Sequence, residues 1–222
     1  MDDATPPLPP APAGSSPPKG LVERVAGILT SPKNEWGVIE GEASNVQSIY
    51  TSYVMILAAI PPVALLLGQQ LIGISFGGIT VKPSIGYSVV SAILQYGLSL
   101  AAVYILALVI DALAPTFKGQ KSLLNAFKVA AYSMTPGWLA GILFIVPILG
   151  LLSFIGAIYG FYLLYLGLPR LMKVKEDQAL GYVGVSIFVN FLVMVIAFVI
   201  VRAISGALFP LVYTVPNVVI YS

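Results

Sequence analysis

Long apolar stretches alternate with short polar segments along this chain. Five of the stretches are long enough to cross a bilayer, and to within a few residues they are 51–72, 87–111, 126–146, 150–169 and 182–204. A hydrocarbon core of about 30 Å needs about 20 helical residues. The run from Val129 to Pro169 carries no charge over 41 residues. A single helix of that length would overshoot any bilayer, so we predict two helices joined by a turn at 147–150.

Lysine and arginine are distributed unevenly over the segments that connect these stretches. Nine of them precede the first stretch, follow the second or follow the fourth: Lys19, Arg24, Lys33, Lys118, Lys121, Lys128, Arg170, Lys173 and Lys175. Lys82 alone lies in an alternate segment, and Arg202 lies near the end of the fifth stretch. Because cytoplasmic loops retain lysine and arginine, we predict an N-terminus in the cytoplasm and a C-terminus outside.

Residues 20–45 are predicted to form an amphipathic cytoplasmic element of one or two short helices. Apolar residues recur at helical spacing over 21–29, and we place Glu23 and Arg24 on the opposite side of that helix. A second helix is predicted to begin at Ser31-Pro32, because serine is a preferred N-cap and proline is tolerated in the first turn. The element is too short and too charged to span a membrane.

The remaining boundaries follow from composition. Residues 1–19 are rich in proline, alanine, glycine and serine, so they are predicted to be a disordered tail. Residues 46–206 are predicted to be the five-span membrane domain. Residues 207–222 are apolar but interrupted by Pro210 and Pro216, which predicts an outer C-terminal tail and not a sixth span.

The amino-acid composition indicates the class of protein and excludes several kinds of functional site. Of the 222 residues, 58% are hydrophobic and only 9% are charged, against about 25% in a soluble domain, which indicates an all-α integral membrane protein. The chain has no cysteine and no histidine, which excludes disulfides, thiol chemistry and nearly all zinc sites. The net charge of +2 is too small to indicate nucleic-acid binding. We expect no cofactor, no metal and no enzymatic activity.

Two kinds of local motif fall inside the predicted spans. Pro61-Pro62 and Pro136 are expected to kink their helices, because proline removes backbone hydrogen bonds. Glycines spaced four apart allow helices to approach closely, and they occur once in the third span and once in the fourth: Gly137, Gly141, Gly156 and Gly160. We therefore predict that these two spans form a tight antiparallel hairpin.

Three further residues are candidate partner or interface contacts. Trp36 lies either at the depth of lipid headgroups or against the cytoplasmic ends of the spans, and both interpretations stay open. Asp111 borders the second span, where we expect Lys118 or Lys128 as its ionic partner. Arg202 is expected to snorkel toward the outer surface. Uncharged polar residues inside the spans are expected to hold helices together: Gln69, Gln70, Gln95 and Asn190.

The chain resembles a known family over most of residues 24–204. The sequence AYSMTP at 131–136 and the sequence LGLPRLMK at 166–173 resemble the bacterial branch of the Yip family, the Ypt/Rab-interacting membrane proteins. ILTSPKNEW at 28–36 resembles the cytoplasmic element that precedes the first span of this family. The resemblance implies five membrane helices. The short, half proline-rich N-terminal region argues against carrying over a Rab-type GTPase as a partner.

We predict a non-enzymatic inner-membrane scaffold or accessory subunit. Its partners would be the lipid bilayer and other membrane proteins or a second copy of itself. The alternative is a small-solute transporter or channel with a site near the kinked spans. A dry, packed bundle favours the scaffold, and a water-filled cavity at mid-membrane depth favours the transporter.

Overall fold

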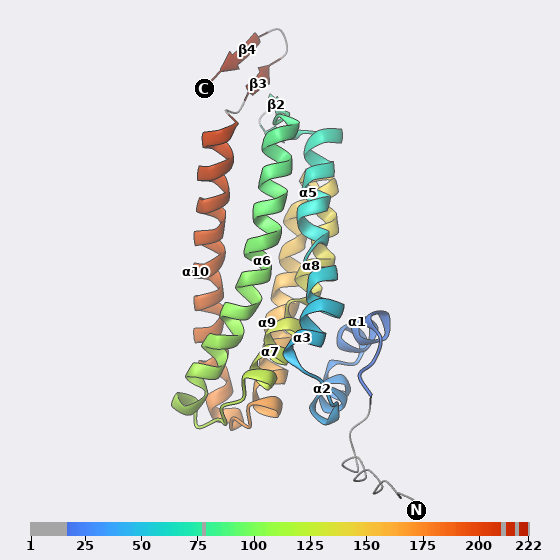
Figure 1. Cartoon of the computed structure of the whole chain (residues 1–222), viewed down its shortest axis with the longest axis vertical. Helices are drawn as coiled ribbons and strands as arrows, with labels where there is room; N and C mark the ends of the chain where they lie inside the picture. The colour runs from blue at the N-terminus through green and yellow to red at the C-terminus, as the bar shows by residue number, and fades with distance from the viewer. Residues whose placement is uncertain (1–16, 77–78, 210–211, 216–217, 222) are drawn as a thin grey trace, which may run out of the picture.

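The computed structural model describes residues 17–76, 79–209, 212–215 and 218–221, so most of the proline-rich tail expected at 1–19 lies outside the described residues. Figure 1 shows an elongated bundle of helices. Two short helices lie beside one end of the bundle, which we call the base, and short strands lie at the opposite end. The two short helices are α1 (Leu21–Thr30) and α2 (Pro32–Gly41). Pro32 stands in the first turn of α2, where its missing N–H costs nothing.

The first crossing is assembled from several short helical pieces. They are α3 (Val46–Ile49), the π-helix η1 (Tyr50–Val54), α4 (Met55–Leu57) and α5 (Ile60–Leu71). The interruption at Ala58 and Ala59 directly precedes Pro61, the position where an expected kink lies. Pro61 and Pro62 cannot donate backbone hydrogen bonds to the preceding turn, so the helix is broken there.

Two longer helices pack against each other. They are α6 (Ile85–Leu113) and α10 (Glu176–Leu208), and the 3-10 turn η2 (Ala114–Phe117) follows α6. The hydroxyl of Ser84 accepts a hydrogen bond from the backbone N–H of Tyr87 at 3.2 Å and caps α6.

The segment between these helices forms a broken hairpin. Its pieces are α7 (Leu123–Ser133), α8 (Thr135–Ala140), the 3-10 turns η3 (Gly141–Ile145) and η4 (Pro147–Leu152), and α9 (Ser153–Leu171). The helix breaks at Met134, directly before Thr135-Pro136, and the chain turns at the extended residue Val146. Helices α7 and α8 both pack on α9.

Four short strands, absent from the all-α expectation, lie at the end opposite the base (Figure 1). They form two antiparallel hairpins: β1 (Ile74–Phe76) with β2 (Ile79–Val81), and β3 (Val212–Val215) with β4 (Val218–Tyr221). Both sequences are rich in β-branched residues, which favour strands. Part of the segment expected to be an outer C-terminal tail therefore pairs its backbone locally, as does the segment of β1 and β2.

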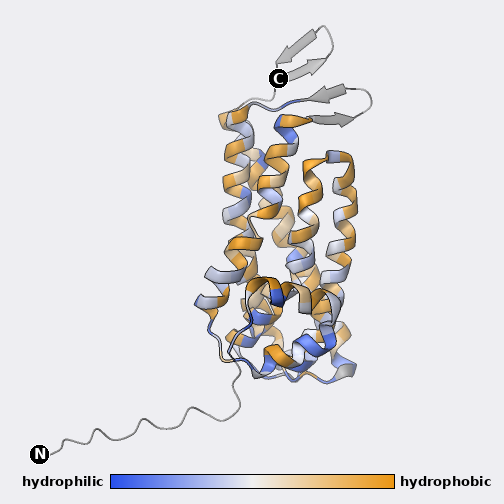
Figure 2. Cartoon of the chain, turned by 90° about the vertical axis from the view of Figure 1, so that its right-hand side faces the viewer, coloured by the Kyte–Doolittle hydropathy of each residue, from blue (hydrophilic) through white to orange (hydrophobic). Residues whose placement is uncertain are grey.

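Among the residues that the structure describes, four helical segments are long and apolar enough to cross a membrane. They are Val46–Leu71, Ile85–Phe117, Pro147–Leu171 and Asp177–Leu208. The predicted span at 126–146 differs from these four because it is divided at Met134, beside the kink expected at Pro136, and tightens into a 3-10 turn at Gly141. Pro136 accounts for the division at Met134, because proline cannot donate a backbone hydrogen bond to the preceding turn. Figure 2 shows apolar residues spread over the long helices and hydrophilic residues gathered near the base.

Candidate functional site

The helix pair α1–α2 is fastened to the base of the bundle by buried aromatic packing. Trp36, Ile28 and Ile39 are all fully buried. The Trp36 indole lies against α9, where a Cβ added to Gly167 would come within 2.8 Å of it. Its ring centroid lies 6.4 Å from that of Tyr132 on α7, in an edge-on arrangement. Of the two interpretations left open by the sequence, the structure places Trp36 against the span ends.

A buried arginine joins the two short helices. Arg24 of α1 is 2% exposed, and its Nη1 lies 2.5 Å from Glu35 Oε1 of α2. Its Nη2 donates to Glu42 Oε1, just beyond α2. The guanidinium carbon stands 5.3 Å from the centroid of the Tyr132 ring. A single guanidinium therefore binds two carboxylates and an aromatic face.

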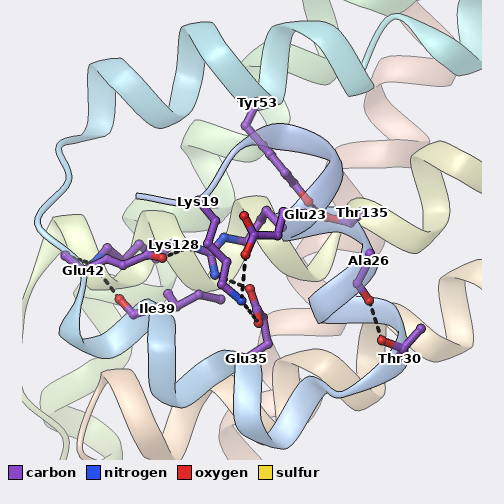
Figure 3. Close-up of polar contacts among 11 residues, drawn as sticks. Lys19, Glu23, Ala26, Thr30, Glu35, Ile39, Glu42, Tyr53, Lys128 and Thr135 are labelled. Atoms are coloured by element: carbon purple, nitrogen blue, oxygen red, sulfur yellow. Dashed lines mark hydrogen bonds and ion pairs between the residues drawn. The ribbon is translucent and has the colours of Figure 1, made fainter. Parts of the chain in front are cut away.

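Two lysines complete this arrangement, drawn in Figure 3. Lys19 Nζ lies 2.9 Å from Glu35 Oε2. Lys128 of α7 is buried, and its Nζ donates to the backbone oxygens of Ile39 at 2.9 Å and Glu42 at 3.1 Å. A cation at these carbonyls satisfies acceptors that the end of a helix leaves free. We call the five residues the ion cluster: Lys19, Arg24, Glu35, Glu42 and Lys128.

The sequence interpretation of the ion cluster was wrong in two respects. Arg24 was placed on the solvated side of α1, but it is three residues after Leu21 and four before Ile28, so it shares their buried face. Lys128 was a proposed partner of Asp111, but its ammonium instead binds the backbone at the end of α2. The helical spacing around Arg24 could have revealed its position.

A second, more exposed contact lies beside the ion cluster. Glu40 of α2 accepts from Arg170 Nε at 3.0 Å and also from Lys173 Nζ. The hydrogen bond from Lys173, and then that from Arg170, hold the pKa of Glu40 below its ordinary value of 4.5 against the opposing effect of burial. The hydroxyl of Tyr159 on α9 donates to the backbone oxygen of Leu29 at 2.8 Å. The helix pair is thus tied to both α7 and α9.

The four glycines of the spaced motifs have different neighbours. A Cβ on Gly156 would lie 2.5 Å from the Pro136 oxygen, and one on Gly160 would lie 2.7 Å from the Ser133 oxygen. Both glycines of α9 therefore face α7–α8. Gly141 instead faces Pro61 of α5, at 2.6 Å from its Cγ, and Gly137 has no atom within 4 Å of such a Cβ. The hairpin contact runs through the glycines of α9 and not through all four.

The two broken helices lie next to each other. Gly141, after the break in the third stretch, packs on Pro61, which follows the break in the first. The hydroxyl groups of Tyr53 and Thr135 lie 2.7 Å apart in a buried hydrogen bond between the same segments. The kinked prolines are thus gathered in one region of the bundle.

The other two candidate contacts, Arg202 and Asp111, take no part in the contacts of the helix pair with the base. Arg202 Nη1 donates to the hydroxyl of Tyr87 at 3.4 Å, near the end opposite the base. Asp111 forms no ion pair among the described residues, although its Oδ1 is buried without a hydrogen-bond partner. The expected pairing of Asp111 with Lys118 is therefore not formed in this structure.

Two surface grooves are open and apolar. One has a volume of about 520 Å³ and is lined by residues of α8, η3, η4 and α9 and by Leu29 of α1. The other, of about 390 Å³, is lined by residues of α3, η1 and α6. Neither is lined by a charged residue. The described residues also hold no group of three or more acidic side chains placed to bind a metal. The ion cluster, whose members bind one another, is suited to holding the short helices against α7.

Comparison with known proteins identifies the family. A family model described as Yip1 domain matches residues 26–198. Inner membrane protein YohC of Escherichia coli strain K12 is 30% identical over 177 residues, covering 78% of this chain and 91% of that protein. YohC of Escherichia coli strain O6:H1 gives the same values. No solved structure matches the chain. The family resemblance found in the sequence is confirmed, and with its four long apolar helices the chain is a multi-pass membrane protein of the Yip1 family.

Proposed function

We propose that this protein is a non-enzymatic scaffold or accessory subunit of the inner membrane, which associates laterally with other membrane proteins. The observation that carries the proposal is the ion cluster, which fixes α1–α2 in one position at the base. A helix pair held by buried ion pairs is a preformed surface. Preformed surfaces bind partners without an ordering cost. The inner-membrane assignment is supported by the name of the similar Escherichia coli protein.

The proposal includes five membrane crossings. Helices α7 and α8 with η3 would make the third, since Leu123–Ile145 is 23 residues long and at about 1.5 Å per residue covers about 34 Å, enough to cross a hydrocarbon core of about 30 Å. The basic residues of the connections would place the base in the cytoplasm and the strand end in the periplasm. The position of α1–α2 and β3–β4 at opposite ends agrees with an odd number of crossings (Figure 1).

Reporter fusions test the crossings. A reporter joined after residue 20 should be active only in the cytoplasm, and one joined after residue 222 only in the periplasm. Both reporters on the same side would rule out five crossings and with them the assignment of α7–α8 as a span.

Photocrosslinking from the helix pair tests the scaffold function. Val22 of α1 is 76% exposed and Val38 of α2 is 37% exposed, so both point away from the bundle. A photoreactive residue at either position should form adducts with a defined membrane protein in living cells. The adducts should weaken when Arg24→Met loosens the ion cluster. Adducts that persist unchanged in this variant would mean that a fixed helix pair is not what the partner binds.

A transporter or channel is the second candidate function. It is favoured by the two broken helices that meet at Pro61 and Gly141, since broken helices expose backbone groups that bind solutes in transporters. Purified protein in liposomes should then pass a small solute, and replacing Thr135, which is fully buried, should alter that flux. Impermeable liposomes would leave the scaffold function as the better account.

A further inference from the structure

The larger apolar groove, lined by α8, η3, η4, α9 and Leu29, is open along the surface of the bundle. Three of its lining residues are small, Pro136, Ala140 and Gly156, and they meet where α8 packs against α9. Ile155 also lines the groove and is 66% exposed. Acyl chains cover any such groove in a bilayer, so its apolar lining alone identifies no occupant.

Tyrosines place one end of the groove at the depth of lipid headgroups. At that end the hydroxyl of Tyr159 donates to the backbone oxygen of Leu29, and both residues line the groove. Tyr162 and Tyr165 follow on α9 and are each 41% exposed. Exposed tyrosines gather at the membrane–water interface. The groove therefore starts at this interface and continues from Tyr159 toward Leu152 over about 10 Å, at about 1.5 Å per residue, into one leaflet.

The turn between α1 and α2, directly after Leu29, presents groups that attract an anion. Ser31 precedes α2 without a capping hydrogen bond from its hydroxyl, and Pro32 has no N–H. The N–H groups of Lys33 and Asn34 therefore have no acceptor among the described residues, and the positive end of the helix dipole lies at the same place. Lys33 is exposed and forms no ion pair in the part of the chain that the structure describes.

The acidic residues near this turn do not cancel its charge. Glu35, in the first turn of α2, is buried and binds Arg24 and Lys19. The more exposed Glu23 lies 3.8 Å from the same Lys19 ammonium. The turn is therefore complementary to an anion, and the groove beside it is complementary to an apolar tail.

We propose that the groove and the turn together bind one anionic phospholipid, with an acyl chain in the groove and the phosphate at the N-terminus of α2 beside Lys33. Leu29 and Ser31 are two residues apart, so the two parts of the site lie within about 7 Å along the chain. Backbone N–H groups at a helix N-terminus bind phosphate readily, and an adjacent lysine adds a full positive charge. The bound lipid contacts α1, α8 and α9 at once, so it stabilises the attachment of the helix pair. The inference goes beyond the scaffold function and does not depend on it.

Native mass spectrometry of the purified protein in detergent tests the headgroup contact, with dioleoyl phosphatidylglycerol and dioleoyl phosphatidylcholine as probes. One molecule of the anionic lipid should bind more tightly than the zwitterionic lipid. Lys33→Gln should weaken binding of the anionic lipid by roughly 5-fold, the effect of one lysine near an anionic headgroup. The matched control Lys121→Gln changes another exposed lysine and should leave the binding unchanged. Equal losses in the two variants, or equal binding of the two lipids, would overturn the proposal.

A bulky side chain in the groove tests the acyl-chain contact. Ile155→Trp fills the groove from an exposed position and should weaken binding of phosphatidylglycerol, whereas Phe154→Trp, at a 67% exposed position outside the lining, should not. Unchanged thermal stability without added lipid shows that both variants fold. Added phosphatidylglycerol should raise the thermal stability of the unsubstituted protein and of Phe154→Trp, and should raise that of Ile155→Trp less. Undiminished lipid binding by Ile155→Trp refutes the acyl-chain contact, and binding of free oleate as tight as that of phosphatidylglycerol refutes a phospholipid as the occupant.

Discussion

Removing the guanidinium of Arg24 should release the helix pair from the base. The side chains of Glu35 and Glu42 are 5% and 1% exposed. Among the described residues Glu42 forms an ion pair with Arg24 alone, and Glu35 forms ion pairs with Arg24 and with the less buried Lys19. Breaking a buried ion pair from one side costs about 3–5 kcal/mol, because a buried charge is left uncompensated. For Arg24→Met this corresponds to a rise of roughly 100- to 4,000-fold in the population with α1–α2 detached.

A buried cysteine placed on α2 can measure that population. Ile39→Cys replaces a fully buried side chain, and its labelling by a maleimide reports detachment of the helix pair. The matched control is Arg170→Met, which removes a contact whose side chains are 49% and 34% exposed and should raise labelling by no more than about 5-fold. Similar labelling in the two variants would refute the reasoning that burial makes the Arg24 contact the stronger one.

Three further predictions follow from the contacts of the helix pair and the hairpin. Gly27→Ala should destabilise the attachment of the helix pair by about 1–3 kcal/mol, because the new Cβ would lie 2.4 Å from the carboxylate of Glu35. Thiol labelling of the buried cysteine should therefore increase. The control Gly41→Ala has open space around its Cβ and should change the labelling little. Gly156→Ala should lower the thermal stability of the purified protein, since its Cβ would meet a backbone oxygen of α8 at 2.5 Å, whereas Gly137→Ala should not. The lowered pKa of Glu40 means that its contact stabilises the protein above pH 4.5 and is lost as the pH falls through that pKa. A maleimide reacts with the thiolate, so labelling is compared at each pH with that of a cysteine placed at the exposed Val22. Relative to that reference, labelling of the buried cysteine should rise on acidification, and less so in a Glu40→Gln variant. Equal relative rises would exclude this contact as the cause.

The long helices could be predicted from the sequence because apolar length is a local property. The runs that became α6, α9 and α10 carry few charges over the distance needed to cross a bilayer, and the paired prolines mark the break before α5. The family could also be recognised, because its motifs are contiguous segments. The C-terminal strands β3 and β4 were missed because the prolines at 210 and 216 were given more weight than the β-branched residues between and after them.

The ion cluster could be assembled only by the tertiary structure. Its members lie on or directly beside α1, α2 and α7, separated by up to about 110 residues in the chain. Local spacing does not show that Arg24 contacts two carboxylates and the ring of Tyr132. The same holds for the spaced glycines. Their spacing predicts a helix face without bulky side chains, but only the packing decides that Gly156 contacts α8 while an added Cβ at Gly137 would have no atom within 4 Å. The sequence by itself determined the four long apolar segments found among the described residues, since apolar length depends on the composition of each segment alone. The tertiary structure decided which polar groups are buried together, since that depends on contacts between segments distant in the chain.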